Sequence, residues 1–216
     1  MKKIAWILAA ALLAGTAAPA QTIAPFKDGD RVVYLGNSIT DGGHYHSYIW
    51  LYYMTRFPEM NLRMYNAGIG GETAGGMFKR LDGDVFSKRP TVLTVTFGMN
   101  DTGYMEYNGD NPEAFGEARY KECFENYKKM EKRLEGLDGV RVVMIGSSPY
   151  DETARIEGNT PLRGKNAVMQ RVVEFQKASA DAHGWEFIDY NAPLVEVGRQ
   201  QQAVDPSFTL TGGDRV

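Results

Sequence analysis

Short apolar runs rich in β-branched residues alternate along this chain with longer segments of helical periodicity. The runs at 91–97 and 140–146 are apolar on both faces, which is typical of parallel strands covered by helices on both sides. We therefore predict one α/β domain, a three-layer α/β/α sandwich around a parallel five-stranded sheet. The expected strands are 31–36, 61–66, 91–97, 140–146 and 185–189, and the expected helices are 46–57, 74–82, 113–137 and 164–183, the last ending at Gly184.

The N-terminal twenty residues have the features of a signal peptide. Lys2 and Lys3 precede the apolar run 4–13, and Ala18-Pro19-Ala20 provides the small residues of a cleavage site. The apolar run is too short to cross a bilayer, and no cysteine follows it that could carry a lipid. We expect a signal peptide over 1–20, cleavage after Ala20, and export of a domain over 21–216 with no stable membrane anchor.

The net charge and the cysteine content limit the binding partners and the covalent cross-links that we expect. A net charge of −3 gives no reason to expect binding to nucleic acid or to an anionic membrane. The one cysteine, Cys123, excludes an internal disulfide, and its helical spacing to Tyr127 and Met130 predicts a buried apolar position.

A serine follows the first expected strand in a tight turn. The apolar run 31–35 leads into Gly36-Asn37-Ser38-Ile39-Thr40, so the Ser38 hydroxyl is expected at the carboxyl end of the sheet, where ligands bind in such folds. Two interpretations are open from these residues alone. Ser38 is either a nucleophile or the N-cap of the next helix.

Two further blocks follow strands in the same way. The glycine block 68–76 lacks the last glycine of G-x-G-x-x-G, which argues against a dinucleotide site, but Gly71 could still offer a backbone N–H to an anionic oxygen. Asn100-Asp101, in the block Gly98–Asp101, is either an ordinary turn or the source of a side-chain N–H at the same cleft.

Together these blocks resemble the SGNH (GDSL-type) esterase and lipase superfamily. The resemblance covers residues 31–216, with asparagine instead of the commoner aspartate before Ser38. It implies a flavodoxin-like fold and an oxyanion hole formed by Ser38, Gly71 and Asn100. It also implies that Ser38 is the catalytic nucleophile.

The fourth block departs from the family pattern Asp-x-x-His. Asp214-Arg215-Val216 supplies the aspartate and both spacers, and the chain ends where the base histidine is expected. We expect Asp214 to be catalytic, and we expect a C-terminal truncation that also removes the last helix. The histidines at 44, 46 and 183 are poor substitutes, and the pair at 44 and 46 lacks an evident third ligand for a metal.

The resemblance implies a serine ester hydrolase that needs no metal or organic cofactor. Aromatic residues near the expected cleft, including Tyr48 and Trp50, and the many carbohydrate O-acetylesterases of the family suggest removal of acetyl groups from carbohydrate. Small-molecule and lipid esters are the other expected substrates. We also expect Asn37, Asp101 and Tyr104 to contact the substrate. The alternative is a non-catalytic module that binds acylated glycans, or an inactive fragment that lacks its base.

Overall fold

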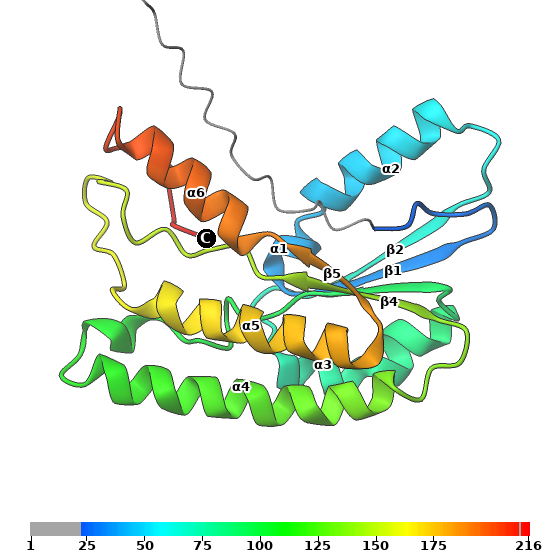
Figure 1. The fold of residues 1–216 in the computed structure, drawn as a ribbon, viewed down its shortest axis with the longest axis horizontal. Coiled ribbons are helices and arrows are strands. Elements are labelled where there is room, and N and C mark those ends of the chain that lie inside the picture. Colours follow the sequence, from blue (N-terminus) through cyan, green and yellow to red (C-terminus); the bar gives the residue numbers. More distant parts are fainter. Residues whose placement is uncertain (1–22, 212) are drawn as a thin grey trace, which may run out of the picture.

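The computed structural model describes residues 23–211 and 213–216, and the predicted signal peptide over 1–20 lies outside the described residues. Within this part of the chain, five strands form one sheet in the order β2-β1-β3-β4-β5, and every neighbouring pair is parallel (Figure 1). The predicted sheet is confirmed. Its strands are β1 (Arg31–Gly36), β2 (Arg63–Gly68), β3 (Val92–Val95), β4 (Arg141–Gly146) and β5 (Glu186–Asp189).

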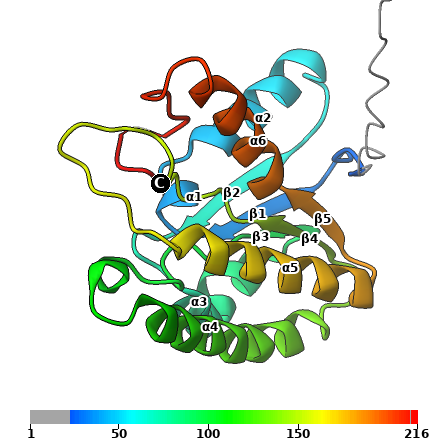
Figure 2. The same cartoon turned by 60° about the vertical axis from the view of Figure 1, so that its left-hand side comes forward.

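Helices cover both faces of the sheet, as the three-layer prediction requires. In Figures 1 and 2, α3, α4 and α5 lie on one face, whereas α2 and α6 lie on the other. The helices are α1 (Ser38–Asp41), α2 (His44–Arg56), α3 (Ala74–Arg80), α4 (Pro112–Leu134), α5 (Lys165–His183) and α6 (Asn191–Gln202), with shorter helical turns at Leu81–Val85, Phe86–Lys88 and Met105–Asn108.

The strands alternate between two hydrophobic clusters, one on each face. On β1, Val33 and Leu35 pack toward α3, α4 and α5, whereas Val32 and Tyr34 belong to the cluster on the opposite face, which includes residues of α2. The same alternation continues on β4, where Val142 and Val143 point to opposite clusters. Because both faces of each strand are buried, the runs read as continuously apolar in the sequence.

Local signals set the ends of the long helices. The Asn111 side chain accepts a hydrogen bond from Ala114 N at the start of α4, and Pro112 occupies the first turn, where its missing N–H costs nothing. At the other end of the next helix, Gly184 adopts φ 65° and ends α5, as predicted.

Two parts of the fold differ from the expectation. Helix α6 is not predicted, because Pro193 and Gly198 are unfavourable residues for a helix. The helix forms nevertheless, since Pro193 lies in its first turn, where proline is tolerated. Strand β2 lies two residues later than expected, since pairing with β1 sets its register through Arg31↔Arg63 and Gly36↔Gly68. Among the described residues, no helix has the length and hydropathy of a membrane-spanning segment.

The sheet order places a topological switch point between β1 and β3. The chain leaves β1 toward β2 on one side and returns to β3 on the other. In open parallel sheets, ligands bind at such a point, beyond the carboxyl ends of the strands. Ser38 follows β1 and Asn100 follows β3, so both residues lie at this position.

Candidate active site

The turn after β1 exposes Ser38 and uses its neighbour as the cap. Oδ1 of Asn37 accepts a hydrogen bond from Ile39 N at 3.0 Å, so Asn37 is the N-cap of α1. Ser38 is the first residue of the helix and is exposed, and its hydroxyl makes no hydrogen bond within the described residues. The structure therefore excludes the N-cap interpretation of Ser38 and leaves the hydroxyl free to react.

The short helix that carries Ser38 rests on the end of β2. A Cβ atom on Gly68 would lie 2.2 Å from the backbone N of Asp41, so only glycine allows this approach. The Asn66 side chain closes the same contact, because its Nδ2 donates to Asp41 O at 3.0 Å. The glycine and asparagine of the second block thus position the turn of the first block.

Gly71 presents its backbone without obstruction. Its φ of 77° lies in the left-handed region that favours glycine, and no atom of the described residues lies within 4 Å of where a Cβ would stand. Arg80 ties this loop to β1: its Nε pairs with Oε2 of Glu72 at 2.6 Å, and its Nη2 donates to Gly36 O at 3.2 Å. The loop with Gly71 is therefore held beside the strand that leads to Ser38.

Asn100 bonds directly to the Gly71 loop. Its Nδ2 donates to Glu72 O at 2.9 Å, and its Oδ1 accepts from the Tyr104 hydroxyl at 2.8 Å. A primary amide has two N–H donors, so one remains available. This second donor is what a side-chain contribution to an oxyanion hole requires.

Two residues expected to contact substrate have other roles. The Asn37 side chain is 1% exposed and caps α1, and the Asp101 side chain is 2% exposed. Asp101 accepts from Ala74 N at 2.8 Å and from Gly98 N at 2.9 Å, which joins the second block to the third. Burial raises the pKa of Asp101. These bonds give both residues a role in positioning the loops of the site, and their substrate contacts remain a prediction.

Of the aromatic residues expected near the cleft, some are buried in the fold and others are exposed. Tyr104 is half-buried beside Asn100, and burial raises its pKa to about 12, so its hydroxyl stays a donor at neutral pH. Tyr107 is buried and its hydroxyl donates to Thr102 O. Tyr48 and Trp50 are exposed on α2 and remain available to a ligand.

The fourth block is anchored by a buried arginine. Arg215 is 1% exposed, and its guanidinium donates to Asp151 O, Ala154 O, and both Oδ1 and O of Asn159, at 2.6 to 3.1 Å. These bonds hold Arg215 at φ 71°, a strained conformation for a side chain with a Cβ. The neighbouring Asp214 is exposed and accepts a hydrogen bond from Val216 N at 3.1 Å.

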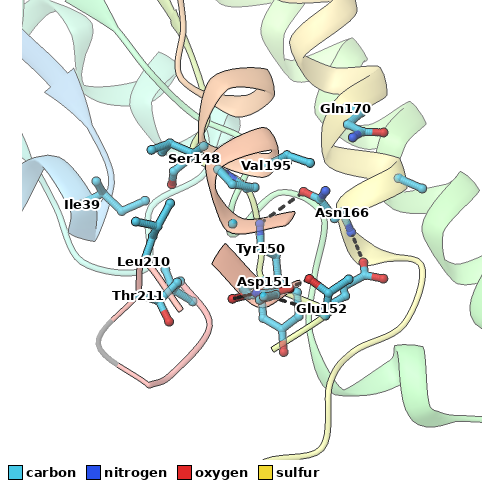
Figure 3. A pocket seen from close by; sticks show the side chains of 17 residues that line it. Ile39, Ser148, Tyr150, Asp151, Glu152, Asn166, Gln170, Val195, Leu210 and Thr211 are labelled. Carbon is cyan, nitrogen blue, oxygen red and sulfur yellow. Dashed lines mark hydrogen bonds between the residues drawn. The ribbon is translucent and has the colours of Figure 1, made fainter. Parts of the chain in front are cut away.

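A cavity connects the fourth block with the first. It has a volume of about 370 Å³ and lies between α5, α6 and the loop after β4 (Figure 3). Ile39, the residue after Ser38, lines it together with Val216, Leu210 and Thr211. Asp214 also contributes to the raised pKa of Tyr104, after burial as the main cause. The fold thus brings all four sequence blocks to one end of the sheet.

Two of the histidines have partners other than the serine. Nε2 of His46 is 3.0 Å from Thr40 O, and its ring stacks on Tyr34. His183 ends α5, whose nineteen residues span about 27 Å at 1.5 Å per residue, and it lies at the end away from Lys165 and the Asn100 loop. Neither histidine is placed to serve Ser38.

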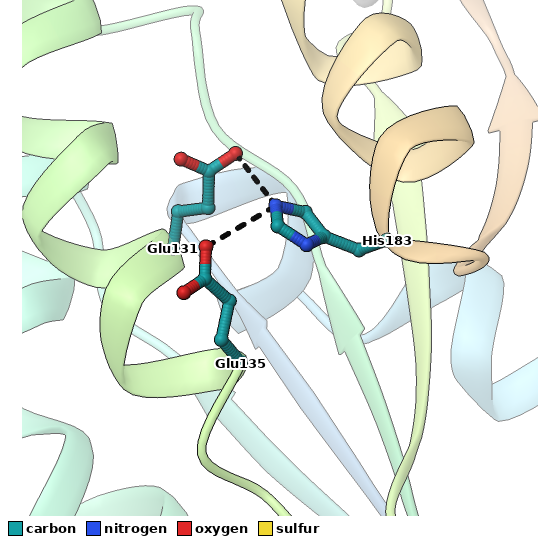
Figure 4. A group of neighbouring side chains, drawn as sticks. All are labelled: Glu131, Glu135 and His183. Atoms are coloured by element: carbon teal, nitrogen blue, oxygen red, sulfur yellow. Dashed lines mark hydrogen bonds and ion pairs between the residues drawn. The ribbon is translucent and has the colours of Figure 1, made fainter.

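His183 instead belongs to an ion-pair cluster between α4 and α5. Its Nε2 lies 3.2 Å from Oε1 of Glu131 and 3.3 Å from Oε1 of Glu135 (Figure 4). Glu131 also pairs with Lys128 and accepts from Ser179, so its carboxylate is already neutralised and bonded. The cluster links the two helices, and the predicted role of His183 as an ordinary helix-terminal residue agrees with this position.

Cys123 is buried, as predicted from its helical spacing. Burial raises the pKa of its thiol, with nearby Asp101 as a further cause, which suits a packing role. Three residues that organise the site were not found from the sequence: Arg80, Lys165 and Arg215. Arg80 bonds to Gly36, 44 positions away, and the partners of the Lys165 and Arg215 side chains lie still farther along the chain, so no local pattern marks these contacts.

A model of the GDSL-like lipase/acylhydrolase family matches residues 34–208, which include Ser38, Gly71 and Asn100. The chain belongs to the GDSL-like lipase/acylhydrolase family. The match covers most of the chain and confirms the resemblance to the SGNH hydrolases that the three blocks indicated. The catalytic roles of the individual residues remain predictions.

Three known proteins are similar to this chain. The solved structure of a gut microbial diltiazem-metabolizing enzyme is 61% identical with a TM-score of 0.88, over 91% of this chain and 44% of that enzyme. An acetylxylan esterase from Geobacillus stearothermophilus is 27% identical over 88 residues, 34% of this chain and 40% of that esterase. The chain therefore spans less than half the length of the first enzyme.

The structure of the Geobacillus esterase shares the fold. It has a TM-score of 0.62 at 20% identity, over 79% of this chain and 80% of that one. Another acetyl xylan esterase has a TM-score of 0.66, also at 20% identity, over 86% and 90% of the two chains.

Proposed function

We propose that this chain is the catalytic domain of an exported serine esterase that removes O-acetyl groups, with acetylated carbohydrate as the substrate. One observation carries the proposal. The exposed hydroxyl of Ser38, unbonded within the described part of the chain, lies at the switch point of the sheet, and Asn100, which has one amide N–H available, follows the neighbouring strand β3 at the same position. Family membership supports acyl transfer as the reaction.

In the proposed reaction, Ser38 Oγ attacks the carbonyl carbon of the ester, and the carbonyl oxygen becomes an oxyanion. The N–H groups of Ser38 and Gly71 and the second N–H of Asn100 donate to this oxyanion. Among the described residues, the Ser38 N–H has no hydrogen-bond partner, as is usual for a donor in the first turn of a helix. By precedent, one such donor is worth roughly 3–4 kcal/mol of transition-state stabilisation.

A general base must take the proton from Ser38 and deliver it to the leaving alcohol. Water then attacks the acyl-enzyme, so that acetate and free Ser38 are formed. The family pattern assigns the base to a histidine three residues after Asp214, which Asp214 would orient. The exposed carboxylate of Asp214, on the segment anchored by Arg215, suits this role.

The substrate proposal rests on what the similar proteins share. The name of the acetylxylan esterase identifies an O-acetyl ester as the group on which that relative acts, and diltiazem, which the 61% identical enzyme metabolizes, also carries an O-acetyl ester. Exposed aromatic rings on α2, among them Tyr48 and Trp50, suit stacking against sugar faces. The export proposal rests on the features of residues 1–20.

A non-catalytic module that binds acylated glycans is the second candidate. It is favoured by the contacts of His46 and His183, whose Nε2 atoms have partners other than Ser38. Such a module would keep the cleft and lose the turnover.

Acetate release from p-nitrophenyl acetate and from acetylated xylan separates the two candidates. The chain is compared with a variant that carries one added histidine after Val216, which completes Asp-x-x-His. The matched control carries an added alanine at that position instead of the histidine. Ser38→Ala and Ser47→Ala are made in each; Ser47 is an exposed serine on α2.

The esterase proposal expects turnover that Ser38→Ala lowers at least ~100-fold and Ser47→Ala leaves unchanged, and faster turnover with the added histidine than with alanine. No Ser38-dependent turnover in any form, together with binding of acetylated xylo-oligosaccharide by calorimetry, would favour the binding module.

A further inference from the structure

A buried lysine lies behind the loop that carries Asn100. Lys165 is the first residue of α5, after Gly164 in the left-handed conformation at φ 93°. Its side chain is 0% exposed and extends from α5 into the loop between β3 and α4. A lysine is almost never fully buried unless its ammonium group is paired.

The loop satisfies every donor of this ammonium. Nζ donates to Met99 O at 2.6 Å, to Gly103 O at 2.6 Å and to Thr102 Oγ1 at 2.8 Å. An ammonium group has three N–H donors and no acceptor, so the three oxygens match it in number. All three belong to a single stretch of the chain, 99–104, which closes around the lysine.

These contacts reach Asn100 by two routes. Met99 immediately precedes Asn100, so the bond to Met99 O fixes the backbone from which the amide extends. Gly103 immediately precedes Tyr104, whose ring centroid lies 4.1 Å from Nζ and whose hydroxyl donates to Asn100 Oδ1. Lys165 therefore holds both the backbone of Asn100 and the side chain that orients its amide.

Burying the ammonium group costs desolvation free energy. Within the described residues no carboxylate contacts Nζ directly, and burial lowers the pKa of Lys165 to about 7. A methionine of similar length would avoid this desolvation, but it would leave two backbone carbonyls and one hydroxyl without the donor. Charged and titratable groups face Lys165 from three elements. They are Asp101 and Tyr104 from the 99–104 loop, Arg119 from α4, and Tyr150 and Glu152 from the loop after β4.

We propose that Lys165 is a positioning residue of the oxyanion hole, whose three hydrogen bonds to the 99–104 loop keep the second N–H of Asn100 directed at the reacting carbonyl. The catalytic part of this inference rests on the proposed esterase function. The structural part, that Lys165 sets the orientation of the Asn100 amide, is independent of turnover.

The test uses a matched pair of substitutions on α5. Lys165→Met removes the ammonium. Gln176→Met is the control, because Gln176 is also fully buried on α5 and donates to a backbone carbonyl, Phe97 O at 3.2 Å, outside the 99–104 loop. Folding of each variant is checked by circular dichroism and thermal melting.

The first readout is the side-chain amide pair of Asn100 in the ¹⁵N–¹H NMR spectrum, assigned by its absence from Asn100→Ala. We expect the two proton shifts to converge and solvent exchange to rise at least ~10-fold in Lys165→Met, with both unchanged in Gln176→Met. Unaltered Asn100 signals in a folded Lys165→Met variant would overturn the proposal, whether or not the chain hydrolyses esters.

The second readout applies to Ser38-dependent turnover. Lys165→Met is expected to lower kcat at least ~10-fold with little change in KM. When Asn100 is already alanine, Lys165→Met should lower kcat less than ~2-fold, because the Asn100 donor that Lys165 positions is then already absent. An equal loss in both backgrounds would show that Lys165 does not act through Asn100. Absence of Ser38-dependent turnover in every form, including the one with the added histidine, would reject the esterase proposal, and the NMR result would then decide the role of Lys165.

Discussion

The hydroxyl of Tyr104 donates a hydrogen bond to Oδ1 of Asn100 across 2.8 Å, and this contact and the bond to Glu72 O together determine which way the Asn100 amide faces. A tyrosine hydroxyl can also accept, but the other partner of the amide is a carbonyl oxygen, Glu72 O, which only accepts. Nδ2 must therefore face Glu72, and Oδ1 must face Tyr104. The remaining N–H of Nδ2 is left for the cleft.

Tyr104→Phe removes this orienting bond and keeps the ring. One hydrogen bond contributes about 1 kcal/mol, so we expect kcat for p-nitrophenyl acetate to fall roughly fivefold with KM nearly constant. Because the pKa of Tyr104 is raised to about 12, its hydroxyl stays protonated between about pH 6 and 9, and its own ionisation does not change the ratio of variant to parent in this range. Tyr127→Phe is the control, since it loses a buried bond to Ser179 away from the site. Equal kcat values for Tyr104→Phe and the parent would contradict this assignment.

Gly68→Ala tests the contact between β2 and the helix of Ser38. The added Cβ would overlap the backbone N of Asp41, so α1 must move and carry Ser38 with it. A displacement on the order of 1 Å can cost ~100-fold in rate, and we expect a loss of that size in kcat/KM. Gly83→Ala is the control because no described atom lies within 4 Å of its added Cβ. Activity within twofold of the parent in Gly68→Ala would show that Ser38 does not depend on this contact.

Arg215→Leu is expected to release the segment that carries Asp214. The substitution leaves several carbonyl oxygens of the 151–159 loop without their donor, which should lower the free energy of unfolding by roughly 2–4 kcal/mol. Arg215→Lys should recover only part of this loss, because one ammonium cannot replace the spread donors of a guanidinium. Urea unfolding measures the stability, and hydrogen exchange of residues 209–216 reports the release. Parent-like exchange in Arg215→Leu would refute the anchoring role.

Stability should rise with pH because of Lys165. Its pKa is about 7 in the folded protein and 10.5 without the fold, so between these values the unfolded chain binds more protons than the folded one. The free energy of unfolding then increases with pH, by at most about 1.4 kcal/mol per pH unit from this group, and is flat from it below about pH 7. Urea unfolding at about pH 7.5 and about pH 9 should show a difference that Lys165→Met removes. The same difference in both proteins would assign it to another group.

The fold could be predicted largely because its strands are buried on both faces. The continuous apolar runs that contain Leu93 and Val143 leave no solvated alternative for a sheet of this size. Helix α6 could not be predicted, because Pro193 and Gly198 lower its helical propensity. Long-range contacts hold it in place, such as the hydrogen bond from Asn191 Nδ2 to Ser147 O at 3.2 Å.

The site could be predicted in part. Ser38, Gly71 and Asn100 follow strands in recognisable blocks, so the sequence indicates both their chemistry and their common edge. The residues that orient them could not be found in this way. Asp101 looks like a polar loop residue but is buried and accepts from the N–H groups of Gly98 and of Ala74 at the start of α3. Lys165 looks like an ordinary helix-start lysine. Their roles depend on partners that only the folded chain brings together.

The most direct test of the central claim is to identify the residue that forms a covalent adduct with diethyl p-nitrophenyl phosphate. This reagent phosphorylates a nucleophilic serine and releases p-nitrophenol, and peptide mass spectrometry locates the phosphoryl group. The account predicts one adduct per chain, on Ser38, formed more slowly in Asn100→Ala and absent in Ser38→Ala. An adduct on another residue, or equal labelling of the parent and Ser38→Ala, would contradict it.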